Sequence, residues 1–434
     1  MSYQNHVAQS HLQTRVLHAD QPDSEVHQTF PVAPSISVST TFKEPHPDSA
    51  LGPKNNDLFK DPHNAECHIY SRYGQDTRMR AERVISSVVG GHALTFSSGL
   101  SAAAAALDFY MPSTVAIRRG YFGVHEVLKK YCYGRNVKII DLDDEYPMEK
   151  GAVAENCPSL RLGTTLVWLE TPLNPTGEAR DIRYYAKKAH EANGYIIVDA
   201  TLAPPPLQDP FKYDVDMIMH SATKYFGGHS DLLAGILATR NVEHFHVLWH
   251  DRSQNGATPG NLENFLLLRS LRTMPLRVRH QSATASKIVA FFDSLTKGKT
   301  PDPDAPSEIT DGKFIAQVWH SDLQPRRANE NEIQDTEKDN HDFDPKEQMP
   351  NGGSPTFGIL TATPKFAKYL PFNVHYMVPA TSLGGVESLI EQRFLADKTM
   401  DPRVLRVSVG LEDFEDLKKD FIQAMVKTMN EHSK

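Results

Sequence analysis

The sequence predicts an α/β protein with a large, mostly parallel sheet and a smaller C-terminal α/β domain. From about residue 65 to residue 256, short β-like runs alternate with helical stretches, which is typical of βα units and of a parallel sheet covered on both faces. After about residue 256 a long helical stretch, polar segments and further strands follow. With 434 residues, of which 39% are hydrophobic, the chain is long enough for one large and one smaller core.

Three segments are expected in chain order. Residues 1–64 are rich in Pro, His, Ser and Thr and are expected to form an extended N-terminal arm, either free or docked on a partner subunit. Residues 65–270 should form the large domain and residues 271–434 the C-terminal domain. Polar segments near 297–312 and 329–353 interrupt the latter, and their low hydrophobicity and clustered charge favour solvated or disordered insertions.

The elements of the large domain follow from local patterns. Apolar and β-branched runs predict strands, at HALTF (92–96), TVAIRR (114–119), VKIIDL (137–142), TTLVWLE (164–170), YIIVDAT (195–201) and VDMIMHSATK (215–224). Good helix formers or a 3.6-residue period predict helices, at SAAAAALDF (101–109), GVHEVLKKYC (123–132) and DIRYYAKKAHEAN (181–193). The last of these helices starts at Asp181, a favourable N-cap residue.

The C-terminal part begins with a helical stretch from Leu262 to Phe292 that Pro275 can break. Strands are expected at NVHYMVPA (373–380) and VLRVSVG (404–410). A final helix is expected at EDFEDLKKDFIQAMVKTMNEH (412–432).

The overall composition excludes several classes of protein. Acidic residues outnumber basic ones by 54 to 46, for a formal charge of −8, which argues against nucleic acid as the main partner. The three cysteines, Cys67, Cys132 and Cys157, are widely spaced and suggest neither a disulfide framework nor a zinc site. The polar N-terminus resembles no secretory signal and no apolar run is long enough to span a membrane. A reducing, cytoplasmic location is expected.

Several catalytic and metal-binding motifs are incomplete. GKT at 298–300 resembles the end of a P-loop, but Asp293 stands where that motif needs a glycine. No G-x-G-x-x-G opens a helix and no G-x-S-x-G is present, which argues against a nicotinamide dehydrogenase and an α/β-hydrolase. His246 and His250 have helical spacing without the glutamate of HExxH, so no metal site is expected.

The segment HSATKYFGGHSD (220–231) sets Lys224 among hydroxyl, aromatic and glycine residues. A lysine amine can form a Schiff base with an aldehyde cofactor such as pyridoxal 5′-phosphate (PLP). That chemistry needs a carboxylate for the pyridine nitrogen, donors for the phosphate, an aromatic ring over the cofactor and an arginine for a substrate carboxylate.

Each of these parts has a candidate. Asp199 ends the apolar strand YIIVD, at the sheet edge where open α/β proteins bind ligands. The stretch FSSGLSAAAAAL (96–107) combines a strand end, a glycine turn and a helix start that can hold an anion. Ser221 and Thr223 add hydroxyl groups, and Tyr121 can stack on the cofactor. Each feature alone is commonplace, but their combination in one chain indicates a PLP site.

These residues resemble the Cys/Met-metabolism PLP-dependent enzymes, the family of the cystathionine γ-synthases, cystathionine γ-lyases and O-acetylhomoserine sulfhydrylases. The resemblance runs from about residue 65 to the C-terminus, with the polar insertions interrupting it. It is carried by motifs in the family's order: YSRYGQDTR (70–78), SSGLSA (97–102), LETPLNPTG (169–177), VDAT (198–201), HSATKYFGGHSDLLAG (220–235), GATPGNLENFLLLRSLRTMPLRVRH (256–280), SLGGVESL (382–389) and LRVSVGLED (405–413).

The resemblance implies fold-type I of the PLP enzymes, the aspartate-aminotransferase-like fold, with residues 65–270 as the PLP-binding domain. It implies that Lys224 carries the cofactor and moves protons, that Asp199 pairs with the ring nitrogen, and that Tyr121 stacks on the ring and can act as an acid. Tyr70 and Arg72 would reach the phosphate of a neighbouring subunit, so a homodimer is the expected active unit, within a homotetramer. The other cofactor-binding residues are Ser98, Gly99, Leu100, Thr201, Ser221 and Thr223.

Substrate-binding residues are implied in the same way. Arg406 would bind the substrate carboxylate beside Ser382, because a guanidinium binds a carboxylate through two parallel hydrogen bonds, and Asn174 and Glu170 would lie near the cofactor ring. The sequence departs from the family at Ala200, at Phe122 and Val124, at Thr381 before Ser382 and in the acidic insertion. These departures leave the substrate and the type of reaction open.

The function expected from the whole motif set is γ-substitution on an activated L-homoserine, its O-acetyl or O-succinyl ester, by a sulfur or carbon nucleophile. The alternative is a lyase that cleaves cystathionine at its β or γ carbon. A catalytically silent relative is disfavoured because Lys224, Asp199 and Arg406 are all present.

Overall fold

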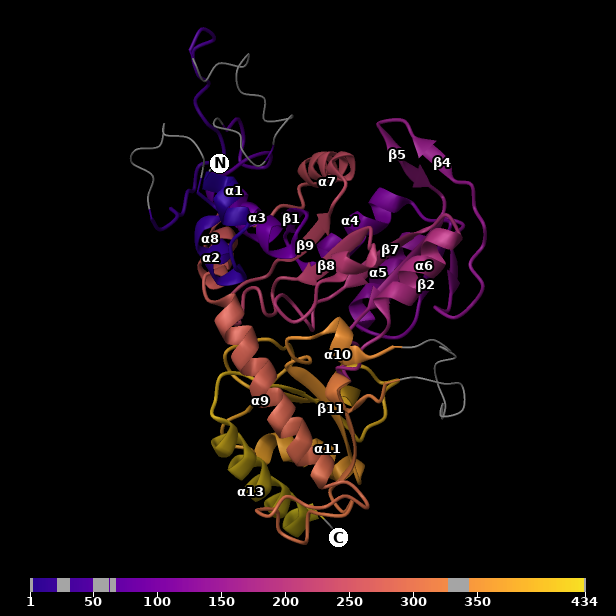
Figure 1. Cartoon of the computed structure of the whole chain (residues 1–434), viewed down its shortest axis with the longest axis vertical. Helices are drawn as coiled ribbons and strands as arrows, with labels where there is room; N and C mark the ends of the chain where they lie inside the picture. Colours follow the sequence, from indigo (N-terminus) through magenta and orange to yellow (C-terminus); the bar gives the residue numbers. More distant parts are fainter. Residues whose placement is uncertain (1–2, 22–31, 50–61, 63–67, 327–342, 433–434) are drawn as a thin grey trace.

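The computed structural model describes residues 3–21, 32–49, 62, 68–326 and 343–432. Its largest element is a seven-stranded sheet in the order β1-β9-β8-β7-β6-β2-β3 (Figure 1). The strands are β1 (His92–Phe96), β2 (Thr114–Ile117), β3 (Lys138–Ile140), β6 (Thr165–Glu170), β7 (Tyr195–Asp199), β8 (Met217–Ser221) and β9 (Gly235–Thr239). The pairs from β8 to β3 are parallel, and β9 is antiparallel to both of its neighbours.

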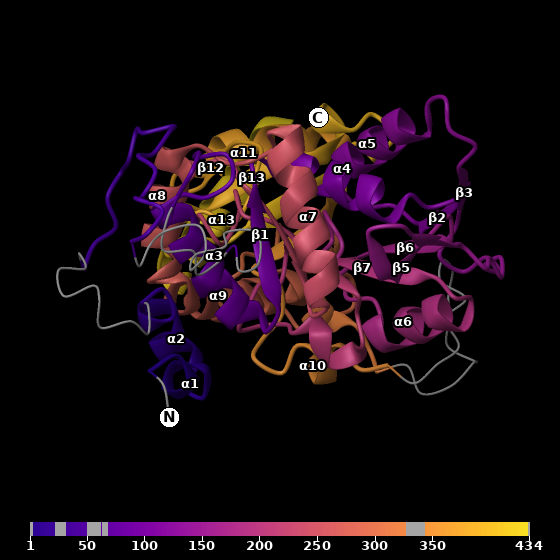
Figure 2. The same ribbon diagram turned by 90° about the horizontal axis from the view of Figure 1, so that it is seen from above.

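Helices cover both faces of this sheet. One face packs on α3 (Asp76–Val89), α6 (Ile182–Glu191) and α8 (Asn261–Leu271). The other packs on α4 (Gly99–Tyr110), α5 (Phe122–Cys132) and α7 (Val242–Asn255), and Figure 2 shows α4 and α7 lying together. The central strands are buried throughout, as expected for a sheet with two covered faces. Asp181 caps α6 by accepting from the Tyr184 N–H, as predicted.

A smaller sheet with the order β10-β11-β14-β13-β12 forms the C-terminal part. Its strands are β10 (Ile315–Trp319), β11 (Thr356–Thr361), β12 (Val378–Pro379), β13 (Leu389–Gln392) and β14 (Val404–Ser408). A third apolar core joins this sheet to α9 (Met274–Ser294), α11 (Pro364–Asn373) and α13 (Phe414–His432). Figure 1 shows α9 running from the large sheet along the smaller one. The strand predicted at 373–380 is reduced to Val378–Pro379.

The predicted helical stretch 262–292 is divided into α8 and α9. Pro275 stands in the first turn of α9, where its missing N–H has no helical partner to lose. The remaining elements are short: β4 (Ala152–Ala154), β5 (Cys157–Leu162), α10 (Pro345–Gln348), α12 (Arg393–Ala396), and the 3-10 turns η1 (Pro210–Tyr213) and η2 (Ser321–Leu323). In the part of the chain described, no helix is long and apolar enough to cross a membrane.

The prediction of an extended N-terminal arm is wrong for its first part. Residues Tyr3–Ala8 (α1) and Leu12–His18 (α2) are helical, and Figure 2 shows both helices at one corner of the molecule. Val16 is buried in the core beside α3, and the buried Asp20 carboxylate accepts from Arg80 at 2.6 Å and from Arg272 at 2.8 Å. Polar composition hid these helices because only a few apolar residues and the two ion pairs of Asp20 attach them to their own large domain.

Of the two predicted insertions, only the first lies entirely within the described residues. Residues 297–312 form turns, and Lys418 of α13 makes ion pairs with Asp302 and Asp304, each at 2.8 Å. This segment is therefore attached to the C-terminal helix. Residues 329–342 of the second insertion lie outside the described ranges, and α10 lies in the remaining part of this insertion. Cys67 also lies outside the described ranges.

Candidate active site

Lys224 follows β8 and reaches toward the C-terminal part of the molecule. Its Nζ donates to Ser382 Oγ at 2.6 Å, so residues 158 positions apart in the chain meet here. Burial, with a smaller contribution from the positive charge of Arg406, lowers the pKa of Lys224 to about 8, although Glu391 opposes this shift. Ser382 has a positive φ of 81°, a conformation that non-glycine residues rarely adopt outside functional sites.

A chain of hydrogen bonds links Asp199 to the Lys224 segment. The Thr201 hydroxyl donates to Asp199 Oδ1 at 2.6 Å, and the Thr201 N–H donates to the same oxygen at 3.1 Å. The Thr201 hydroxyl also accepts from the Ser221 N–H at 2.8 Å. Asp199 is buried, which raises the pKa of its carboxyl group, and the Thr201 bonds oppose that shift. Thr201 therefore fixes the orientation of the carboxylate relative to Ser221.

The start of α4 faces Ser221. A Cβ atom at Gly99 would lie 3.0 Å from both Cβ and Oγ of Ser221, so the approach of these two segments requires glycine. Ser98 caps α4, and its Oγ accepts from the Ser101 N–H at 3.1 Å. Among the described residues no acceptor contacts the N–H groups of Gly99 and Leu100, which suits an anion at a helix N-terminus.

Thr223 lies beside this cradle with its hydroxyl already engaged. Its Oγ1 donates to the Ala234 carbonyl at 3.3 Å and accepts from the Ala234 N–H at 3.1 Å. In this arrangement the hydroxyl holds the loop after Lys224 against β9. The Ser221 hydroxyl, by contrast, lies directly against the start of α4.

Glu170 supports Tyr121 from the end of β6. Its Oε2 accepts from the Tyr121 N–H and its Oε1 from the Asn174 N–H, each at 2.7 Å. Burial and the neighbouring Asp199 raise the pKa of Glu170. The Tyr121 ring packs over Gly123, makes an edge contact with Phe122 and is 37% exposed. Both carboxylate oxygens of Glu170 thus accept hydrogen bonds from backbone N–H groups, and the Tyr121 side chain is partly exposed to solvent.

Arg406, on β14, binds three groups of this cluster. Its guanidinium donates to the Ser382 carbonyl at 2.6 Å, to Asn174 Oδ1 at 3.1 Å and to Glu391 Oε2 at 2.7 Å. Arg406 is buried, and burial together with Arg393 lowers its pKa to about 10, which still leaves it charged at neutral pH. Asn174 from the large domain and Ser382 from the C-terminal part are thereby joined through one guanidinium.

Glu391 and Arg393 were not predicted from the sequence. Glu391 lies directly opposite Arg406 in the β13–β14 pairing, and its Oε2 also accepts from Arg393 at 2.8 Å. Glu391 and Arg393 are each 6% exposed, while Glu391 Oε1 and Arg393 Nε have no partner within the described residues. Only the register of two strands could have revealed this cluster.

Tyr70 and Arg72 lie apart from this group. The Arg72 guanidinium donates to the Ser253 carbonyl, near the end of α7, at 2.7 Å, and it lies over the Tyr70 ring. The backbone of Tyr70 forms an isolated antiparallel β-bridge with Thr41. Tyr70 is 41% exposed. In the part of the chain described, no hydrogen bond or ring contact joins Tyr70 or Arg72 to the Lys224 cluster.

The residues around Lys224 have functional groups that are suited to bind PLP. A buried amine with a lowered pKa is suited to bond to an aldehyde. A buried carboxylate at the end of a strand is suited to a protonated pyridine nitrogen, and the cradle between Gly99 and Ser221 offers helix N-terminal N–H groups to a phosphate. No group of three or more metal-ligating side chains occurs in the described part of the chain.

Sequence comparison identifies the same chemistry. A profile described as "Cys/Met metabolism PLP-dependent enzyme" matches residues 13–299. Cystathionine gamma-lyase of Saccharomyces cerevisiae is 29% identical over 96% of this chain and 98% of its own length. Cystathionine gamma-synthase of Mycobacterium tuberculosis is 28% identical over 87% of this chain and 94% of its own length.

Solved structures of similar proteins have the same overall fold as this chain. The crystal structure of yeast cystathionine gamma-lyase superposes with a TM-score of 0.74 at 26% identity, covering 97% of this chain and 99% of that one. A methionine gamma lyase from Micromonospora echinospora gives 0.73 at 27% identity, covering 96% and 99%. The predicted fold class, fold-type I of the PLP enzymes, is confirmed, and the cofactor is pyridoxal 5′-phosphate. The chain belongs to the Cys/Met-metabolism family of PLP-dependent enzymes.

Proposed function

We propose that this enzyme catalyses γ-substitution on an activated L-homoserine, its O-acetyl or O-succinyl ester, with a sulfur or carbon nucleophile. The observation that carries the proposal is the cluster in which Ser382 binds both the Lys224 amine and the Arg406 guanidinium. It sets a proton-transferring amine next to a group for an amino-acid carboxylate. The alternative is elimination from cystathionine, which the names of the lyase relatives support.

PLP, when bound, withdraws electrons from the substrate carbons next to the amine. Asp199 would keep the ring nitrogen protonated, and Thr201 holds the carboxylate in place for this. Gly99, Leu100 and Ser221 would hold the phosphate, with Ser98 maintaining the first turn of α4. These roles follow from the donor and acceptor capacity of each group.

Lys224 would move the protons. Because its pKa is lowered to about 8, a sizeable fraction of the amine is neutral near neutral pH and can accept a proton. A γ-substitution requires proton removal at two adjacent carbons, which suits a long, unbranched amine. Ser382 orients the amine, and Tyr121, held through its backbone by Glu170, would protonate the leaving group.

Arg393 would give the carboxylate site its net positive charge. Arg406 and Glu391 alone form a neutral pair, which has little attraction for a further carboxylate. Arg393 contacts the same Glu391 oxygen, so the cluster carries two positive charges and one negative charge. A substrate carboxylate on Arg406 would then neutralise the cluster without displacing Glu391.

The substitution Arg393→Gln should therefore raise KM for the amino-acid substrate about tenfold, because a charge-assisted interaction contributes about 1.5–3 kcal/mol. The value of kcat should change little, since Arg393 does not contact the reacting atoms. Steady-state kinetics of both constants test this. Arg403→Gln, which breaks a surface ion pair with Asp401, is the matched control. An unchanged KM in Arg393→Gln would remove this role.

The lowered pKa of Lys224 predicts how cofactor attachment depends on pH. Only the neutral amine attacks an aldehyde, and its fraction rises with pH until the pKa is passed. Attachment of PLP to the apoprotein should therefore accelerate as the pH rises to about 8 and level off above it. Stopped-flow absorbance measures this rate. A rate that continues to rise toward the ordinary lysine pKa, about 10.4, would contradict the burial argument.

We propose further that Tyr70 and Arg72 complete the phosphate site of a neighbouring subunit. The exposure of the Tyr70 side chain and the absence of a contact between either residue and the Lys224 cluster, in the part of the chain described, support this. The active unit would then be a homodimer, in the homotetramer expected from the sequence.

A product screen tests the proposed reaction. The holoenzyme is incubated with O-acetylhomoserine or O-succinylhomoserine plus cysteine or sulfide, and separately with cystathionine alone. Formation of a thioether or thiol product at Cγ supports substitution. Keto acid and ammonia from every mixture, together with cleavage of cystathionine, would establish the lyase instead.

A further inference from the structure

One face of α9 contacts both of the loops that carry Lys224 and Ser382. Arg277 and Gln281 lie four residues apart on this helix, and residues with this spacing project from the same face. Arg277 is 5% exposed and Gln281 is 0% exposed. Because α9 runs from the large sheet along the smaller one (Figure 1), its buried face can bind segments of both parts of the molecule.

Arg277 binds the peptide group that directly follows Lys224. Its Nη1 donates to the Tyr225 carbonyl, and its Nη2 donates to the Ser270 carbonyl in the last turn of α8, each at 3.0 Å. Its Nε donates to Thr273 Oγ1 at 3.2 Å. The guanidinium therefore joins the turn after Lys224 to the C-terminal end of a helix, where the helix dipole favours a positive charge.

Gly228 makes room for this guanidinium. The residue has a positive φ of 71°, and a Cβ atom at this position would overlap Nη1 of Arg277. The Gly228 N–H donates to the Lys224 carbonyl at 2.6 Å, so the glycine also closes the turn that begins at the lysine. Among the described residues, the acceptors of Arg277 are two carbonyls and one hydroxyl. Hydrogen bonds from a charged donor are stronger than those between neutral groups, so this turn is firmly attached to α9.

Gln281 binds the loop that follows Ser382. Its Nε2 donates to the Gly385 carbonyl at 2.7 Å and to the Val409 carbonyl, directly after β14, at 3.1 Å. The Gln281 amide is buried, so replacing it with an apolar side chain would leave two carbonyls without this donor. The same helix that holds the turn after Lys224 therefore also holds the loop after Ser382.

The two loops also contact each other. The Val386 N–H donates to the Gly228 carbonyl at 3.0 Å. Gly384 has a φ of 78°, and a Cβ atom there would lie 2.8 Å from the Tyr225 nitrogen, so the close approach of the loops requires glycine at this position. The place of the amine in one loop relative to the hydroxyl in the other is thus fixed by this packing and by its attachment to α9.

We propose that Arg277 and Gln281 are positioning residues, which hold the two loops on α9 and thereby keep the Lys224 amine against Ser382 and away from water. In the described structure neither side chain donates to the amine itself. This role rests on the proposed function of Lys224 as the amine that bonds to PLP. It applies equally to substitution and to elimination, because both need the same amine.

The pH dependence of PLP attachment tests this role. Arg277→Met and Gln281→Met each remove the bonds to the loops and should admit water to the amine, which raises its pKa. The pH at which the attachment rate levels off should therefore rise by at least about one pH unit above the value near 8 expected of the unaltered chain. Stopped-flow absorbance of the full-length apoprotein mixed with PLP measures this rate, and Tm is measured in parallel.

Two features of these variants separate hydration from other effects. The charged groups that act on the Lys224 amine, Arg406 on β14 and Glu391 on β13, remain in place. Gln281→Met changes no charge, so a rise in that variant is not an effect of a lost cation, and it keeps the test available if Arg277→Met does not fold. Arg277→Lys keeps the charge and one donor group, so its rise should be smaller than that of Arg277→Met.

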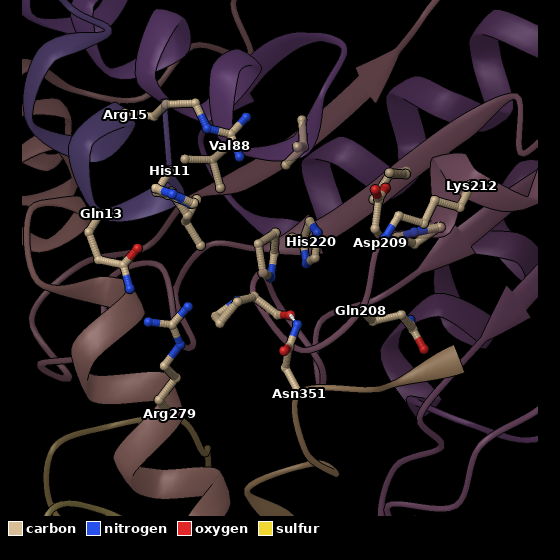
Figure 3. A pocket seen from close by; sticks show the side chains of 16 residues that line it. His11, Gln13, Arg15, Val88, Gln208, Asp209, Lys212, His220, Arg279 and Asn351 are labelled. Carbon is tan, nitrogen blue, oxygen red and sulfur yellow. Dashed lines mark hydrogen bonds between the residues drawn. The ribbon is translucent and has the colours of Figure 1, made fainter. Parts of the chain in front are cut away.

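Arg279→Met is the matched control on the same helix. Arg279 lies two residues from both Arg277 and Gln281, about 200° around the helix axis. It lines a cavity of about 270 Å³ next to α2 and the loop leading into η1, outside the Lys224 cluster, and Figure 3 shows it among the residues of that cavity. Attachment of PLP to this variant should level off at the same pH as in the unaltered chain.

Two results would overturn the proposal. In the first, attachment levels off at the same pH in Arg277→Met, in Gln281→Met and in the unaltered chain, even where Tm is lowered, so that both residues act on stability alone. In the second, Arg279→Met shows an equal rise, so that any change in α9 has this effect. Failure of the proposed γ-substitution is distinguished by its products, and attachment that persists in Lys224→Ala would contradict the role of Lys224 itself.

Discussion

Lys224→Ala should reduce turnover by at least about 10²–10⁴-fold, the range for loss of a positioned acid–base group. The loss should be larger still if attachment of the cofactor is also required. Lys224 is the amine that Ser382 binds at 2.6 Å, and alanine leaves no group there to move a proton. Product formation from each candidate substrate, together with the absorbance of the bound cofactor, measures both effects.

The control for this variant is Lys187→Ala, which removes an exposed lysine of α6 and should leave kcat unchanged. Added alkylamines should restore part of the activity of Lys224→Ala, because a free amine can occupy the vacated space. If Lys224→Ala retained the activity of the unaltered enzyme, neither the γ-substitution nor the lyase alternative could proceed as described.

Asp199→Asn should lower kcat by about 10²–10³-fold, comparable to removing one preorganised electrostatic group from an active site. An amide cannot balance the positive charge of a protonated ring nitrogen, although it occupies nearly the same volume. The Thr201 hydroxyl can still donate to the amide oxygen, so the local structure should be kept. The measurement is kcat at saturating substrate, with the bound cofactor quantified for each variant.

Asp214→Asn is the control with the same chemical change. Asp214 is exposed and has a φ of 60°, a conformation that asparagine also adopts readily. It should have the kcat of the unaltered enzyme. An Asp199→Asn variant that kept its full kcat while retaining the cofactor would show that the ring nitrogen does not need this carboxylate.

The large domain could be predicted because its signals are local. Asp199 ends an apolar strand, and the glycine turn at Gly99 joins a strand to a strong helix former, so both are recognisable within a few residues. The motif around Lys224 combined with these positions to identify the family, which the sequence profile confirms. The fold followed from the alternation of strands and helices.

Features that depend on distant pairing could not be predicted. The meeting of Glu391 with Arg406 depends on the register of β13 and β14, and a connection that contains α12 separates the two strands in the chain. The engagement of Thr223 with Ala234 depends on a loop that returns to its own start. The N-terminal helices were missed because Asp20 attaches them through arginines far along the chain.

The exposed surface beside Tyr121 bears on selectivity. Phe122 is 41% exposed and contacts the Tyr121 ring edge-on, so an apolar group borders the approach to the site. Sequence alone showed this residue as a departure from the family, but its exposure and its contact with Tyr121 required the structure.

The contact between Lys224 and Ser382 joins the two halves of the molecule, because Lys224 follows a strand of the large sheet and Ser382 precedes a strand of the small one. Any separation of these lobes would admit water to the amine. A hydrated ammonium is stabilised, so the proton affinity of the amine would return toward that of an ordinary lysine. The fraction of neutral Lys224 amine is thus coupled to the distance between the two lobes. An amino acid that bridges the lobes through Arg406 and Asn174 would hold this amine in the neutral form that can accept a proton from the amino acid.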